Sequence, residues 1–167
     1  MSIAIMQPYF LPYIGYWQLL SVVDQFVIYD DIQFTKRGWI NRNNILVNNE
    51  KFLITIPIRK HGEKSKICDI KLVEDITKKA KLLKTIKMSY SKAPFFEKVF
   101  PLIKKIIESD EENLFSYINF SIKLISQYLG IESSKIIISS SLKISKNLKG
   151  EDRIISICKK LKANSYY

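Results

Sequence analysis

The first 31 residues of the chain contain two short apolar runs, separated by one segment with helical periodicity. Residues 2–6 form a run that stops at Gln7-Pro8, and residues 25–29 form a second run that ends in Asp30-Asp31. Between the two runs, apolar and aromatic residues recur at helical spacing after Pro12. Strand, helix and strand in so few residues predict a βαβ unit and therefore a parallel sheet.

A hairpin is predicted directly after this unit. Residues 44–47 and 52–58 are strand-like and flank Asn48-Asn49-Glu50, which is a turn signal. Residues 67–72 alternate between apolar and polar side chains, so we expect them to be extended and to pair nearby.

The middle of the chain is predicted to be helical. Asp75 or Thr77 can cap a first helix, and a short second helix follows. Ser109 or Asp110 can cap a third helix, and Gly130 stops it.

A further buried strand and a last helix complete the pattern. Residues 135–139 are an apolar run of strand length, and residues 150–161 are amphipathic. We therefore expect an α/β fold of three layers, with a mostly parallel, Rossmann-like sheet, an inserted β-hairpin and a helical segment. No internal repeat or linker is visible, so we expect residues 1–167 to form one domain.

The sequence bears on cellular location and on the state of the cysteines. No apolar run approaches the roughly 18 residues that a membrane helix needs, and the first residues do not resemble a signal peptide. We therefore expect no membrane insertion and a cytoplasmic location. Cys68 and Cys158 lie far apart in apolar segments, and we expect two reduced, packed thiols.

The chain is strongly basic, with a net charge of +11. Such a charge is typical of proteins that bind nucleic acids or anionic membranes. It is also what a solvated, lysine-biased surface gives, and only Arg37, Arg42, Arg59 and Arg153 are arginines. Because no nucleic-acid-binding motif accompanies the charge, we favour the second interpretation and do not expect a nucleic-acid partner. A basic surface favours a small substrate that carries phosphate.

The segment after the first strand is dense in Pro, Gly and Tyr. Gln7, Tyr9, Tyr13, Gly15 and Tyr16 lie at the carboxyl end of a predicted parallel strand, where open α/β sheets bind ligands. Glycine at position 15 allows a close approach of the backbone. The alternative is a tyrosine-rich turn that packs a helix on the sheet.

Asp30 and Asp31 end the second strand, at the same edge of the sheet. Paired acids there can bind Mg²⁺ together with a substrate phosphate, or can bind a sugar hydroxyl. The alternative is one capping acid and one solvated acid. Ser139 and Arg153 can reach this edge from the last predicted strand and helix, although such residues are more often plain caps.

Residues 36–43 gather unusual side chains in a predicted loop. Lys36 and Arg42 can bind phosphate, Trp39 can stack on a ring, and Asn41 and Asn43 carry amides. The alternative is a surface loop whose Trp fills the core. No His/Cys cluster that could hold a metal is present, because His61 is the single histidine.

These residues resemble the signature of WbqC-like proteins. The similarity is carried by Met6–Tyr16, Asp24, Phe26–Asp31, Lys36, Gly38–Asn43, Lys92–Phe96, Lys149-Gly150 and Arg153–Lys159. It covers essentially the whole chain. Members of that family usually continue past the position of Tyr167 with several tens more residues, and if those residues complete the site, this chain is a truncated form.

The resemblance implies a role in the assembly of O-antigen and other surface polysaccharides. It implies a transferase that acts on a nucleotide-linked or lipid-linked sugar and adds an amino or acyl group, or a sugar. A looser similarity links Tyr13-x-Gly15-Tyr16 to the His-x-Gly-His motif of nucleotidyltransferases, with Tyr in place of both His.

Two hypotheses remain. In the first, the chain is an enzyme in which Asp31 is a base or metal ligand, Lys36 and Arg42 hold phosphate, and Trp39 is a stacking platform. This hypothesis does not identify the cofactor, and a nucleotide with Mg²⁺ is one candidate. In the second, the chain is a nucleic-acid-binding or accessory protein that uses its lysine-rich helices. The clustering of unusual residues before position 44 favours the first hypothesis.

Overall fold

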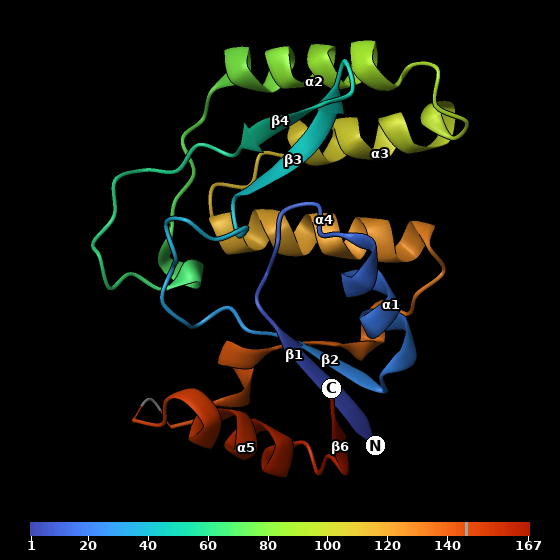
Figure 1. Ribbon diagram of the computed structural model, residues 1–167. Coiled ribbons are helices and arrows are strands. Elements are labelled where there is room, and N and C mark those ends of the chain that lie inside the picture. Colours follow the sequence, from blue (N-terminus) through green and yellow to red (C-terminus); the bar gives the residue numbers. More distant parts are fainter. Residues whose placement is uncertain (146) are drawn as a thin grey trace.

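A parallel sheet forms the centre of the computed structural model, which describes residues 1–145 and 147–167 (Figure 1). Its strands are β1 (Ser2–Met6), β2 (Gln25–Ile28), β5 (Ile136–Ile138) and β6 (Ser165–Tyr166). They lie in the order β5-β2-β1-β6, and all three pairings are parallel. The predicted α/β class with a parallel sheet is therefore confirmed, and the carboxyl ends of these strands meet at one edge.

Helices cover both faces of this sheet. The helices are α1 (Ile14–Val22), α2 (Ile76–Tyr90), α3 (Phe96–Ile107), α4 (Leu114–Tyr128) and α5 (Gly150–Lys160). Because successive side chains of a strand point to opposite faces, Phe26 packs in the core with α1 and α4, whereas Val27 packs against Ile157 of α5. Figure 1 shows α1 and α4 on one side of the sheet and α5 on the other.

The predicted hairpin is also present. β3 (Arg42–Val47) and β4 (Glu50–Thr55) are antiparallel, and Asn48 and Asn49 connect them with positive φ angles of 52° and 62°. Asparagine tolerates this conformation better than most residues, which makes it a common hairpin turn residue. The hairpin lies beside α2 and α3, and α4 separates these elements from the sheet (Figure 1).

Helix caps agree with the sequence at two ends and differ at one. Asp75 accepts a hydrogen bond from the Lys78 amide at 2.9 Å, and Gly130 ends α4 with a φ of 70°. The cap of α4 is Asn113, so the predicted cap at Ser109 or Asp110 is wrong. Asn113 itself is extended, its side-chain oxygen accepts from the Ser116 amide at 3.1 Å, and its side-chain nitrogen donates to the Cys68 carbonyl at 2.7 Å.

The segment of residues 67–72 is only partly extended. Ile67–Asp69 form a 3₁₀ turn, termed η1, and the pairing is limited to single bridges of Leu72 to Ile58 and of Lys71 to Asn113. The turn buries Ile67 and Ile70, and the alternating pattern did not distinguish this arrangement from a strand.

The helices of the described residues are short. The longest, α2 and α4, have 15 residues each, whereas a bilayer requires roughly 20. In the part of the chain that the structure describes, no helix is long and apolar enough to cross a membrane.

Tyr16 lies at the centre of the core rather than at the surface. Its side chain is 0 % exposed, and its ring contacts Phe26 at a centroid distance of 4.9 Å and also lies against Tyr9 and Trp17. Its hydroxyl has no hydrogen-bond partner among the described residues. Burial, with a smaller contribution from Tyr9, raises the pKa of Tyr16 well above its ordinary value.

We predict that Tyr16→Phe retains the stability of the wild type at pH 7 or increases it by about 1 kcal/mol, because it removes an unpaired buried hydroxyl. The unfolded chain releases the tyrosine proton near pH ~10, but the native state keeps it. Stability is therefore lost as the pH rises above that value. Tyr16→Phe should lose less stability than the wild type between pH 7 and alkaline pH. Urea unfolding at both pH values measures this difference. A large loss of stability at pH 7 would contradict the unpaired placement of the hydroxyl.

Candidate functional site

Two loops form an open cleft beside the carboxyl end of β1. Tyr9, Pro12 and Tyr13 line it from the loop after β1. Trp39 lines it from the segment that leads into β3, and Asn43 and Asn44 line it from the start of β3 itself. The cleft, termed the aromatic cleft below, has a volume of about 320 Å³. The structure thus brings together Tyr9, Tyr13, Trp39 and Asn43, which the sequence had predicted as binding residues.

Hydrogen bonds tie the two loops together. The Phe10 amide donates to the Ile40 carbonyl at 3.0 Å. The Asn43 side-chain nitrogen donates to the carbonyls of Phe10 and Leu11, at 3.1 and 2.5 Å. Since Phe10 is fully buried, these bonds attach both walls of the cleft to the core. Asn43 therefore shapes the cleft, and its amide nitrogen is already occupied.

Arg42 fixes the position of Trp39. Its guanidinium carbon lies 5.7 Å from the centroid of the Trp39 ring, within the range of a cation–π contact. Its Nε donates to the Gly38 carbonyl at 2.8 Å, and one terminal nitrogen donates to the Arg37 carbonyl. Trp39 is 47 % exposed, so its ring remains available to a ligand. The geometry supports a positioning role for Arg42 more directly than a phosphate contact.

Gly15 makes room for Tyr13. A Cβ atom at position 15 would lie 2.5 Å from a ring carbon of Tyr13, which is shorter than any normal contact. The Tyr13 ring can therefore lie across the start of α1 only because residue 15 is glycine. Tyr13 is 64 % exposed at the mouth of the cleft.

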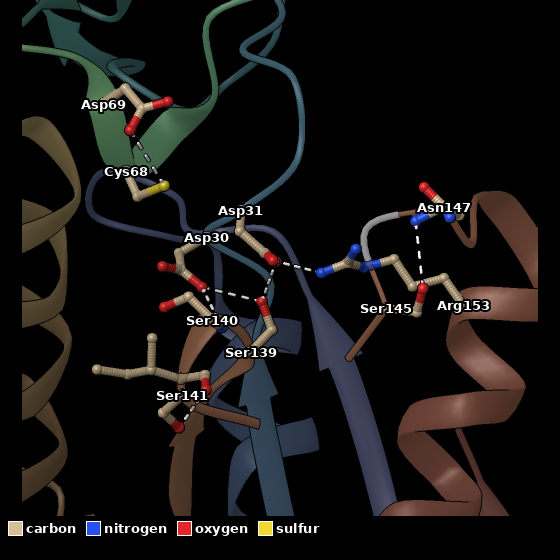
Figure 2. A network of polar contacts seen from close by, with 11 residues as sticks. Asp30, Asp31, Cys68, Asp69, Ser139, Ser140, Ser141, Ser145, Asn147 and Arg153 are labelled. Carbon is tan, nitrogen blue, oxygen red and sulfur yellow. Dashed lines mark hydrogen bonds and ion pairs between the residues drawn. The ribbon is translucent and has the colours of Figure 1, made fainter. Parts of the chain in front are cut away.

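A second cluster of polar residues lies at the carboxyl ends of β2 and β5 (Figure 2). Asp30 is buried and accepts hydrogen bonds of 2.9 Å from the Ser139 hydroxyl and from the Ser140 amide. The Ser139 hydroxyl also lies 2.6 Å from an Asp31 oxygen. The other Asp31 oxygen forms an ion pair with Arg153, which reaches the edge from α5.

The Ser139 hydroxyl lies between the carboxylates of Asp30 and Asp31. Ser139 has one hydroxyl hydrogen between two carboxylate oxygens, so it can donate to only one of them at a time. When Ser139 donates to Asp31, Asp30 still accepts a hydrogen bond from the Ser140 amide. Each carboxylate therefore retains at least one donor, and Arg153 balances one of the two negative charges.

The cluster does not offer an obvious metal site. The Arg153 guanidinium already pairs with one Asp31 oxygen, which a metal ion would otherwise need as a ligand. Nowhere in residues 1–145 and 147–167 do three or more His, Cys, Asp or Glu side chains converge on a position for an ion. The residues present fit an ion pair with Arg153 better than they fit Mg²⁺.

Cys68 lies next to this cluster but is not a reactive thiol. Its backbone amide donates to the Asp30 carbonyl at 3.0 Å. Burial, followed by the charges of Asp69 and Asp30, raises the pKa of Cys68 to about 11. The thiol is therefore protonated near neutral pH and is a poor nucleophile.

The other predicted site residues are distributed between core and surface. Tyr16 is buried behind Tyr9, and Asn41 is buried with its amide donating to the Ile56 carbonyl at 2.9 Å. Gln7 is half-buried directly after β1, and Lys36 is exposed on the turn before Trp39. Neither Tyr16 nor Asn41 can contact a ligand without a rearrangement.

Sequence reasoning missed some functional candidates. Asn44 lines the aromatic cleft, but the sequence assigned it only to a strand. Its place beside Asn43 was the available signal. Ser139 and Arg153 were weighed mainly as caps, yet the structure joins both to Asp31.

Comparisons with known proteins agree over nearly the whole chain. The sequence profile of the WbqC-like protein family matches residues 7–167. An uncharacterized protein, Rv1507c, of Mycobacterium tuberculosis is 28 % identical over 166 residues, which cover 99 % of this chain and 71 % of that protein. No solved structure matches.

We predict that Arg153→Met lowers the free energy of unfolding by about 3 kcal/mol, because it leaves the Asp31 carboxylate without its cation in a largely buried position. Adding Asp31→Asn should recover part of the loss. Lys104→Met is the matched control, since its 3.9 Å pair with Glu108 is exposed and should contribute less than about 1 kcal/mol. Denaturant unfolding measures all four proteins. Equal effects of the two single methionine variants would contradict the ion pair.

Proposed function

This chain belongs to the WbqC-like protein family, and we propose that it is a transferase acting on a nucleotide-linked or lipid-linked sugar in the assembly of surface polysaccharides. The observation that carries the proposal is the aromatic cleft, in which exposed rings face side-chain amides at the carboxyl edge of a parallel sheet. Open α/β sheets bind their ligands at this edge.

The chemistry of the cleft suits a sugar or base ring. Trp39 and Tyr13 present flat apolar faces, and Asn44 presents an exposed amide that can bond to hydroxyl groups. Ligand sites commonly have volumes of about 300–1,000 Å³. The volume of about 320 Å³ lies at the lower end of that range, which suits one ring and not a whole nucleotide-linked sugar.

Positive charge beside the cleft suits a phosphate. Lys36 and Arg37 are exposed on the turn that precedes Trp39. Neither forms an ion pair with an acid in the part of the chain that the structure describes. A sugar 1-phosphate is the group common to nucleotide-linked and lipid-linked sugars, and it would place a ring in the cleft and an anion at this turn.

Asp31 is the proposed base. It follows β2, which pairs directly with β1, so it lies at the same edge as the loop that carries Tyr9 and Tyr13. Asp31 would accept the proton from an acceptor hydroxyl or amino group, and that atom would bond to the transferred group. The leaving phosphate would depart with the electron pair of the broken bond, and Lys36 would stabilise its charge. Ser139 and Arg153 orient the carboxylate.

We predict that a sugar 1-phosphate, or a UDP-, dTDP- or GDP-linked sugar, stabilises the protein in a thermal-shift screen with and without Mg²⁺. A ligand at 100 times its Kd adds about 2.7 kcal/mol to the native state. Trp39→Ala should weaken binding by roughly 10- to 100-fold, since the stacking of one ring contributes about 1–3 kcal/mol. Tyr128→Ala is the control, because Tyr128 is 44 % exposed on α4 and does not line the cleft.

The same screen includes a short RNA at two salt concentrations. A salt-sensitive response to RNA that Trp39→Ala leaves unchanged, without any sugar-phosphate response, would contradict the proposal and favour a nucleic-acid-binding protein. Equal losses in the Trp39 and Tyr128 variants would remove the aromatic cleft as the site.

A further inference from the structure

A second cleft is lined almost wholly by apolar side chains. It lies between β3, the end of α2 and the start of α3 and has a volume of about 300 Å³. Leu11, Ile45, Ile86, Phe95, Val99 and Ile103 are among its lining residues. We call it the apolar cleft.

The two clefts share the same chain segments. Leu11 lines the apolar cleft, whereas Pro12 and Tyr13, the next two residues, line the aromatic cleft. On the other side, Asn44 lines the aromatic cleft and Ile45 lines the apolar one. Because Asn44 and Ile45 are consecutive residues of β3 and successive side chains of a strand point to opposite faces, the two clefts lie on opposite sides of this strand.

The junction between the clefts is held in an unfavourable conformation. Leu11 has a φ of 48°, a region that residues with a branched side chain rarely adopt. The Asn43 amide donates to the carbonyls of Phe10 and Leu11 and so holds this turn. The strained residue is the one that turns its side chain to the apolar cleft while its neighbours serve the aromatic cleft.

The apolar cleft is open to solvent and has little that could bind water. Phe95 at its edge is 64 % exposed. Tyr90 brings a hydroxyl, but that oxygen already accepts a hydrogen bond from the Leu46 amide at 2.8 Å. An open apolar surface of this kind marks a binding site more often than a solvated face.

The elements that line the apolar cleft carry an excess of positive charge. Lys84, Lys87, Lys92 and Lys98 are exposed on the helices and the connection that line it. None of them forms an ion pair within residues 1–145 and 147–167. Glu97 is the single acid in the sequence from residue 76 to residue 107. The charge is complementary to an anionic amphiphile, not to a neutral one.

We propose that the apolar cleft binds the hydrocarbon chain of an anionic, lipid-linked sugar. The inference rests on the proposed function and deepens it, because it assigns a lipid-linked molecule as one substrate. The occupant is a single amphiphile molecule. The alternatives are a bilayer surface and an apolar segment of a protein partner, and the test separates them.

The test measures the affinity of hexyl, octyl and decyl phosphate, each below its critical micelle concentration, by isothermal titration calorimetry. In the wild type the affinity should rise roughly threefold to fourfold per added methylene, until the chain fills the cleft. Val99→Trp fills the cleft and should abolish this dependence. Val22→Trp, at a 72 % exposed position on α1, should leave it unchanged.

A second variant tests the cleft even if Val99→Trp does not fold. Phe95→Ser changes an exposed side chain at the edge, so it should fold normally and weaken decyl phosphate more than hexyl phosphate. Equal affinity for all three chains, or equal dependence in the Val99 and Val22 variants, would overturn the inference. Binding to anionic vesicles without binding to monomeric decyl phosphate would overturn it in favour of a bilayer surface, and binding to neither would favour a protein partner.

The outcomes distinguish a failure of this inference from a failure of the proposed function. If a sugar 1-phosphate binds and Trp39→Ala removes it, but chain length has no effect, the lipid-linked substrate is wrong and the sugar site stands. If chain length matters but no sugar phosphate binds, the apolar cleft stands and the sugar transferase is wrong.

Discussion

The hydrogen bonds from the Asn43 amide to the carbonyls of Phe10 and Leu11 connect β3 to the turn after β1, and residues of these two segments line both clefts. One side chain in the first strand of the hairpin thereby fixes the turn after β1. Because that turn carries Tyr9 and Tyr13 on one side and Leu11 on the other, the aromatic cleft and the apolar cleft depend on the same bonds. The strain at Leu11 persists only because the surrounding structure determines this turn so fully.

The parallel sheet supplies the rest of the arrangement. Parallel pairing places the ends of β1, β2 and β5 at one edge, so that Asp31 and Ser139, which are 108 positions apart, share a hydrogen bond. Arg153 joins them because α5 packs on the opposite face of the sheet from α1 and brings its first turn to this edge. A polar cluster that is anchored on two strands and a helix is more rigid than one built from loops alone, which is what an oriented carboxylate requires.

The sequence was informative wherever the signal was local. Two apolar runs around one helical segment predicted the pairing of β1 with β2, and Asn48-Asn49 predicted the hairpin. The carboxyl ends of parallel strands bind ligands, which predicted Tyr9 and Tyr13 as site residues, whereas the unusual composition of residues 36–43 predicted Trp39 and Asn43. The apolar cleft could not be predicted, because its walls come from β3, α2 and α3, and periodicity does not tell how separate elements dock. Nor could spacing show that the donors of Arg42 are used by backbone carbonyls, or that Tyr16 and Asn41 are buried.

The central claim is that a sugar-phosphate ring binds against Trp39. The chain has two tryptophans, and they report on different places: Trp39 is 47 % exposed in the aromatic cleft, whereas Trp17 is 8 % exposed and donates from its indole nitrogen to the Pro12 carbonyl at 3.0 Å. Labelling with 5-fluorotryptophan gives each one its own ¹⁹F resonance. Titration with a sugar 1-phosphate should shift the Trp39 resonance to saturation and leave that of Trp17 nearly in place. An unmoved Trp39 resonance in the presence of a bound ligand, or equal shifts of both, would contradict the account.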